Sequence, residues 1–138
     1  LTRIDELLTE QVDFAIETTL STRSYVSMIQ QAHTLGFKVT LIFVWLESPE
    51  LAIERVAQRV AKGGHHIPSD IVRRRYQRGL YNLLHLYIPL VDLWSVTNNT
   101  KNELETIANG QGNIAQSIFN PYFWNQIQFI ANGNERNN

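Results

Sequence analysis

The hydrophobic positions of the first half of the chain alternate between helical and strand-like spacing. Ile4, Leu7 and Leu8 recur at helical intervals, whereas residues 12–17 (VDFAIE) alternate as a short strand does. A helix that Ser21 can cap then runs to about residue 36. Residues 38–46 are nearly all β-branched or aromatic, which predicts a central parallel strand that is buried on both faces.

The second half begins with two helices in a row. Pro49 opens the first, which ends at Gly63 and Gly64, and Ser69 caps the second, a long amphipathic helix. Residues 93–97 form a third predicted strand. The remaining elements are a final helical segment over residues 114–130, interrupted at Pro121, and a frayed tail over residues 132–138.

This order of elements predicts an α/β fold with a parallel sheet and helices on both faces, a three-layer α/β/α arrangement, within a single domain spanning residues 1–138. Ligands of such sheets bind outside the carboxyl ends of the strands. The chain starts with Leu rather than Met and opens directly into a helical pattern, so we interpret it as a piece truncated at its N-terminus.

Composition narrows the classes of function. The chain has no cysteine, which excludes disulfides and a thiol nucleophile and fits a cytoplasmic protein. Its formal net charge of −1 provides no general attraction for nucleic acid, and one basic run (RRRYQR) does not change that. No stretch reaches the about 18 apolar residues that a membrane span needs. We therefore expect neither nucleic acid nor membrane as a partner.

Polar side chains follow the first predicted strand. Glu17 could orient a substrate hydroxyl or hold a magnesium-bound water, and the hydroxyls of Thr18 and Thr19 could bind a polar substrate. The alternative is an ordinary helix-capping loop with a solvated Glu17. The two interpretations are equally compatible with the residues alone.

Arginines are concentrated in the two consecutive helices. Arg55, Arg59 and Lys62 share the face opposite the apolar stripe, which is usually a solvated surface. Arg73 instead falls inside the apolar arc of its helix, where a buried charge needs a partner. That partner could be a phosphate in a cleft or a carboxylate such as that of Glu47.

The segment between these helices, KGGHHIP, is short and rich in glycine. It could hinge an arginine-rich lid over residues 55–78, or it could be an ordinary turn with surface histidines. His65 and His66 are adjacent and face opposite ways, so we expect no metal site there.

The string FAIETTLS, GFKVTLIFVWLESPELAIERVAQRVAKGGHHIP and DIVRRRYQRGL resembles the zeta-toxin-like group of P-loop kinases over about residues 13–99. The resemblance implies a P-loop NTPase-type fold. In that family an acid in the place of Glu17 helps hold a sugar-nucleotide substrate.

The same stretch is more distantly similar to nucleoside monophosphate kinases. That similarity implies that Arg55 stacks on adenine, Arg59 reaches a phosphate and Arg73 contacts the transferring phosphoryl group. The loop that cradles adenine corresponds to residues 98–100, which are Asn98, Asn99 and Thr100.

One motif of the family is missing: GxxxxGK[ST] occurs nowhere in the chain. We therefore expect the full-length parent to be an ATP- and Mg²⁺-dependent kinase that acts on a small-molecule hydroxyl, with this part inactive alone. The alternative is a non-catalytic module that binds a nucleotide or a protein, such as an antitoxin. Because truncation would bare a sheet edge, we also expect a homo-oligomer or a swapped assembly that covers the gap.

Overall fold

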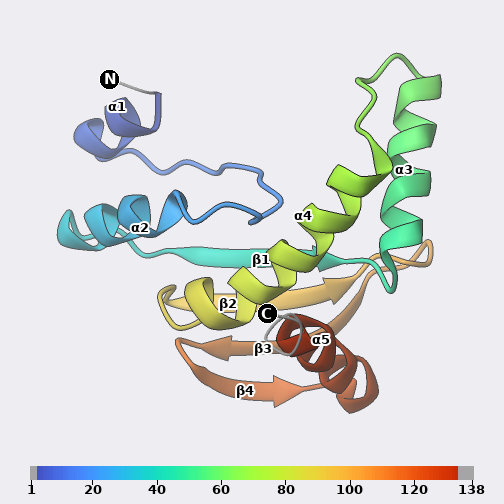
Figure 1. The fold of residues 1–138 in the computed structure, drawn as a ribbon. Helices are drawn as coiled ribbons and strands as arrows, with labels where there is room; N and C mark the ends of the chain where they lie inside the picture. The colour runs from blue at the N-terminus through green and yellow to red at the C-terminus, as the bar shows by residue number, and fades with distance from the viewer. Residues whose placement is uncertain (1–2, 134–138) are drawn as a thin grey trace.

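The computed structural model describes residues 3–133 of the chain. A four-stranded sheet lies at its centre, with helices around it (Figure 1). In chain order the elements are α1 (Arg3–Glu10), α2 (Tyr25–Thr34), β1 (Thr40–Trp45), α3 (Pro49–Ala61), α4 (Ser69–Asn82), the π-helical turn η1 (Leu83–Tyr87), β2 (Leu93–Asn98), β3 (Glu105–Gln111), β4 (Ile114–Ile118) and α5 (Pro121–Gly133).

The strands lie in the order β1-β2-β3-β4. β1 and β2 are parallel and in register, with Phe43 opposite Val96, whereas β3 and β4 continue the sheet antiparallel. The α/β class and its parallel strand pair are thus confirmed, and the arrangement is consistent with a P-loop-like α/β fold. The antiparallel extension makes the sheet mixed.

β1 differs from its prediction in two respects. It is an edge strand of the described sheet rather than a central one, with β2 as its parallel neighbour. Its side chains alternate in burial: Trp45 is buried, whereas Ile42 and Val44 are 68% and 52% exposed. The prediction of burial on both faces was wrong, because an apolar run cannot show whether both faces have neighbours.

The predicted strand at residues 12–17 is also not formed. This segment is irregular, and within residues 3–133 no backbone hydrogen bond joins residues 13–19 to another segment. The helix that follows it begins at Tyr25, with Ser24 rather than Ser21 at the capping position. A strand needs a partner for its backbone groups, and the apolar alternation that predicts it does not provide one.

The prediction of a final helical segment over residues 114–130 was wrong in its first part, because residues 105–118 lie in two strands and the turn between them. They form the hairpin β3–β4, whose two-residue loop starts at Gly112 in a left-handed conformation (φ 59°). Gly110 is required for packing, because a Cβ there would lie 2.5 Å from the ring of Trp94. Only α5, after Pro121, is helical as expected, and it extends to Gly133; residues 134–138 of the predicted tail lie outside the described part.

The core lies between the sheet and the helices α4, η1 and α5. The rings of Trp94 on β2 and Trp124 on α5 stack with centroids 5.4 Å apart, and Val96 and Ala108 are fully buried beneath the helices. Burial of apolar side chains on this face is the main force that holds the helices on the sheet.

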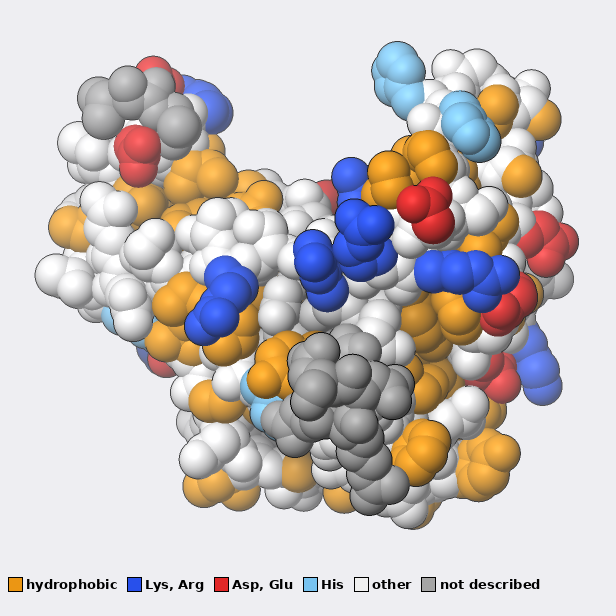
Figure 2. Space-filling view, viewed as in Figure 1, with side chains coloured by type: hydrophobic (Ala, Val, Ile, Leu, Met, Phe, Trp, Pro, Cys, Tyr) orange, Lys and Arg blue, Asp and Glu red, His pale blue; other side chains and the backbone are white. Residues whose placement is uncertain are grey.

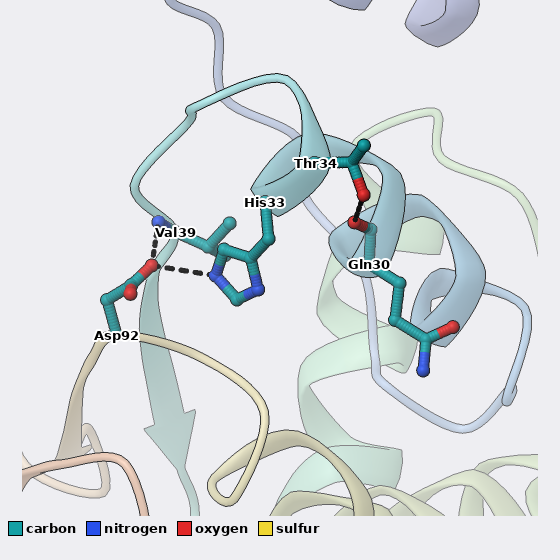
Figure 3. Close-up of polar contacts among 5 residues, drawn as sticks. All are labelled: Gln30, His33, Thr34, Val39 and Asp92. Carbon is teal, nitrogen blue, oxygen red and sulfur yellow. Dashed lines mark hydrogen bonds and ion pairs between the residues drawn. The ribbon is translucent and has the colours of Figure 1, made fainter.

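A polar contact fixes the start of the parallel strand pair (Figure 3). One carboxylate oxygen of Asp92, just before β2, accepts a hydrogen bond from the Val39 N–H at 2.7 Å and lies 2.9 Å from His33 Nε2 on α2. The Val39 N–H, and to a lesser degree His33, lower the pKa of Asp92. The contact therefore joins α2, β1 and β2 at the amino-terminal ends of the parallel strands.

Candidate functional site

A cleft of about 920 Å³ opens along the free edge of β1 and at its carboxyl end. The segment of residues 14–20 lines one side, and α3 and α4 line the other. Figure 2 shows the hollow between the side of the molecule that carries α1 and α2 and the side that carries α3 and α4. Its position at a strand's carboxyl end matches the place predicted for a ligand.

The predicted substrate residues lie in this cleft. Glu17, Thr18 and Thr19 are exposed and line it, as expected for side chains that meet a ligand. The Thr18 hydroxyl accepts a hydrogen bond from the Leu20 N–H at 3.1 Å, and the Thr19 hydroxyl lies 2.9 Å from that of Ser21. These hydroxyls therefore shape a tight local turn as well as facing the cleft.

Helix α4 and the π-helical turn η1 hold that turn in place by three contacts. A Cβ at Gly79 would lie 2.6 Å from the Thr19 carbonyl oxygen, so only glycine permits this approach. The buried Asn82 amide donates to the Leu20 carbonyl at 2.7 Å. The Tyr87 hydroxyl donates to the carbonyl of Thr22 at 2.6 Å.

Leu20 itself is strained. It is buried and has a φ of 58°, a left-handed conformation that is uncommon for a residue other than glycine. Such a conformation persists only where surrounding contacts stabilise it, and it often occurs at functional sites. The contacts from α4 and η1 therefore determine where Glu17, Thr18 and Thr19 lie.

The predicted nucleotide residues are brought together at the carboxyl ends of β1 and β2. The Arg55 guanidinium donates to the carbonyl oxygens of Asn99 at 2.9 Å and Thr100 at 3.4 Å. Asn98 is buried. Its side-chain oxygen Oδ1 accepts a hydrogen bond from the Thr100 hydroxyl, and its side-chain NH2 group donates to the Glu47 carboxylate at 3.2 Å. This network fixes the turn, and Arg55 also lines the cleft.

Of the two arginines that were expected to contact phosphate, Arg59 lines the cleft and Arg73 does not. Arg59 is exposed and lines the cleft, as does Arg75 on α4. Arg73 does not line it. Its guanidinium pairs with the Glu50 carboxylate at 2.6 Å, with 52% of the Arg73 side chain exposed. This contact lowers the pKa of Glu50.

The expectation that Arg73 lies within the apolar arc of its helix was therefore wrong, although Arg73 does have a carboxylate partner, that of Glu50. Leu80, about two turns further along α4, is fully buried, whereas Arg73 lies near the start of the helix, where its side chain is exposed and meets Glu50 of α3. The spacing of Val72, Arg75 and Gly79 was the available signal for the face that meets the cleft.

A polar chain joins the carboxyl end of β1 to α4. The indole N–H of Trp45 donates to the Tyr76 hydroxyl at 3.1 Å, and that hydroxyl donates to the Leu46 carbonyl at 2.7 Å. Burial raises the pKa of Tyr76 to about 12, so it stays a neutral donor at ordinary pH. Helix α4 is thereby anchored to the strand beside the cleft.

The donor set of the cleft suits an anionic ligand. Arg55, Arg59 and Arg75 provide guanidinium groups that match phosphate oxygens, and Glu17 provides a carboxylate on the opposite side. Within residues 3–133 no three His, Asp or Glu side chains gather as a metal cage would require. Magnesium bound with a nucleotide is held mainly by phosphates, waters and one or two carboxylates, and Glu17 can supply one.

The fold and the cleft thus define an α/β protein with an arginine-lined site at the carboxyl ends of parallel strands. The family model described as zeta toxin matches residues 2–106, and the chain belongs to that family. Membership supports a P-loop-type fold and a nucleotide as the class of ligand. The sheet strand β4 and helix α5 lie beyond the matched residues.

A curated protein of Haemophilus influenzae with no assigned function is 36% identical over 67 residues, which are 49% of this chain and 48% of that protein. The matched region thus spans about half the length of this curated relative. No solved structure is similar to the chain. No helix within residues 3–133 is both long and apolar enough to cross a membrane.

Proposed function

We propose that the protein transfers the γ-phosphoryl group of ATP to a hydroxyl group of a small molecule, in the manner of a P-loop kinase. The observation that carries the proposal is the cleft with Arg55, Arg59 and Arg75 on one side and Glu17 on the other. Phosphoryl transfer requires positioning and stabilisation of charge on the transferring group, and guanidinium groups provide both.

Each residue then has a role. Arg55, next to the turn formed by Asn98, Asn99 and Thr100, holds the nucleotide. Arg59 stabilises the developing charge on the phosphoryl group. Arg73 joins it in this role when its ion pair with Glu50 opens.

On the acceptor side, Glu17 orients the reacting hydroxyl, and Thr18 and Thr19 bind the rest of the acceptor. A sugar nucleotide is the acceptor we favour. ATP is bound with Mg²⁺, which neutralises charge between the β- and γ-phosphates. The chain contains no GxxxxGK[ST] loop, so the proposal requires that other residues supply the main phosphate cradle.

The test is a γ-phosphoryl transfer assay on the natural protein that contains these residues, with ATP, Mg²⁺ and sugar-nucleotide acceptors. Arg59→Ala should lower kcat on the order of a hundredfold, the usual effect of losing one transition-state charge contact. Arg78→Ala is the control, because Arg78 is exposed on α4 and does not line the cleft. Equal rates for the two variants, or no transfer to any hydroxyl, would overturn the proposal.

The missing phosphate loop favours a second candidate, a module that binds a nucleotide or a protein partner such as an antitoxin without catalysis. The two candidates differ in one measurement. ATP binding that weakens in Arg55→Ala, without any phosphoryl transfer by the natural protein, would support the binding module.

A further inference from the structure

The C-terminal part of the molecule carries a surface that the proposed function does not use. Of the six large apolar side chains in residues 3–133 that are more than 60% exposed, five lie in this part: Leu104, Ile114, Phe119, Tyr122 and Phe129. We call the set formed by Phe119, Tyr122 and Phe129 the α5 surface. It lies outside residues 2–106, which the family model matches.

This part of the chain is also uncharged. No Asp, Glu, Lys, Arg or His occurs between Thr106 and Asn134, although charged residues make up 18% of the whole sequence. In Figure 2 the described side chains at the bottom of the view are orange and white, whereas several blue side chains lie above them. Exposed apolar surface of this kind commonly marks a site of association.

α5 has two apolar sides. One side, with Trp124, Ile127 and Ala131, is buried in the core. Tyr122 and Phe129 lie seven residues apart, hence on a common face, and are 74% and 73% exposed. A helix that is apolar on two sides needs a second neighbour to remove that surface from water.

We propose that the α5 surface binds a second copy of this chain, with the two α5 helices antiparallel across a two-fold axis. In such an interface Tyr122 of one copy packs on Phe129 of the other, and the reverse contact is made at the same time. Aromatic pairs of this kind are favourable when the rings are offset or edge to face. Asn125, which is exposed between them, lies near the axis.

The absence of charged residues argues against several possible binding partners of the α5 surface. An anionic membrane or a nucleic acid would need Lys or Arg on this surface, and residues 106–134 contain none. A charged peptide would find no complementary group there either. A second copy is apolar and uncharged at the matching position, so no repulsion or unpaired buried charge opposes its approach.

The experiment measures the mass of the full chain in solution across a dilution series, by light scattering and sedimentation. We expect a dimer for the natural sequence. Phe129→Glu should weaken dimerisation by at least about 30-fold, because a charge would be buried at an aromatic hot spot. Phe129 is exposed, so the variant should fold, and its circular dichroism checks this.

Ile42→Glu is the matched control, since Ile42 is equally exposed but lies on β1 beside the cleft. It should leave the dimer intact. A monomeric natural chain, open-ended association without a defined dimer, or a dimer that Ile42→Glu dissociates while Phe129→Glu does not would each overturn the proposal.

A second measurement tests the axis directly. Because the chain has no cysteine, Asn125→Cys introduces a single thiol, which should form an intermolecular disulfide under mild oxidation. Gln58→Cys, on the exposed face of α3, should not do so. A dimer in which Cys at position 125 fails to cross-link would contradict the antiparallel arrangement.

Discussion

Asn82→Ala should loosen the turn that carries Glu17 and lower the stability of the whole chain. The Asn82 amide is buried and donates to the Leu20 carbonyl at 2.7 Å. Its loss leaves a buried carbonyl without this donor, which costs about 1–3 kcal/mol. The higher helix propensity of Ala offsets roughly 0.5 kcal/mol of that cost. The expected net loss is therefore about 0.5–2.5 kcal/mol.

Thermal and urea unfolding measure this change, and for a chain of this size the melting temperature should fall by about 3–8 °C. Hydrogen exchange should in addition become faster at the Leu20 amide, which donates to the Thr18 hydroxyl within the turn, because surrounding contacts hold Leu20 at a φ of 58°. Gln58→Ala is the control, since the same kind of truncation occurs there at an exposed helical position. If both variants are as stable as the natural chain, the Asn82 contact does not hold the turn.

Three further predictions concern titratable groups. Tyr76→Phe should destabilise the fold by about 1 kcal/mol through loss of the hydrogen bond to Leu46. Burial raises the pKa of Tyr76 to about 12, whereas in the unfolded chain this hydroxyl ionises near its ordinary pKa of about 10. The difference should therefore shrink as the pH rises from about 10 to about 12, because ionisation then favours the unfolded chain. Asp92→Asn should destabilise the chain at neutral pH and lose its effect in acid. The pKa of Asp92 is lowered, so its carboxyl group stabilises the fold only while it is ionised. Urea unfolding at several pH values checks both variants. Glu50→Gln should free Arg73 from its ion pair. If that ion pair restrains Arg73, the variant of the natural protein should show faster ATP-dependent phosphoryl transfer. An unchanged rate would remove Arg73 from the site.

The candidate site was predictable in part because its residues follow local rules. Polar residues after an apolar strand lie at the carboxyl end of the sheet, and for this reason the carbonyl oxygens of Asn99 and Thr100 lie where Arg55 can reach them. Glu17 reaches the cleft although its segment is not a strand. In that case the approach of Thr19 to Gly79 places the acid, and no pattern in the sequence indicates that contact.

The sequence by itself determined the helices α3 and α4, the strands β1 and β2 and the polar turn after β2, because each depends on side-chain spacing within one segment. The tertiary structure alone decided three further features: residues 12–17 do not form a strand, residues 105–118 form a hairpin, and Arg75 rather than Arg73 lines the cleft. Strand pairing requires a partner that is distant in the chain. Which of several neighbouring arginines faces a cleft depends on how the helix is rotated against the sheet, and contacts from other elements set that rotation.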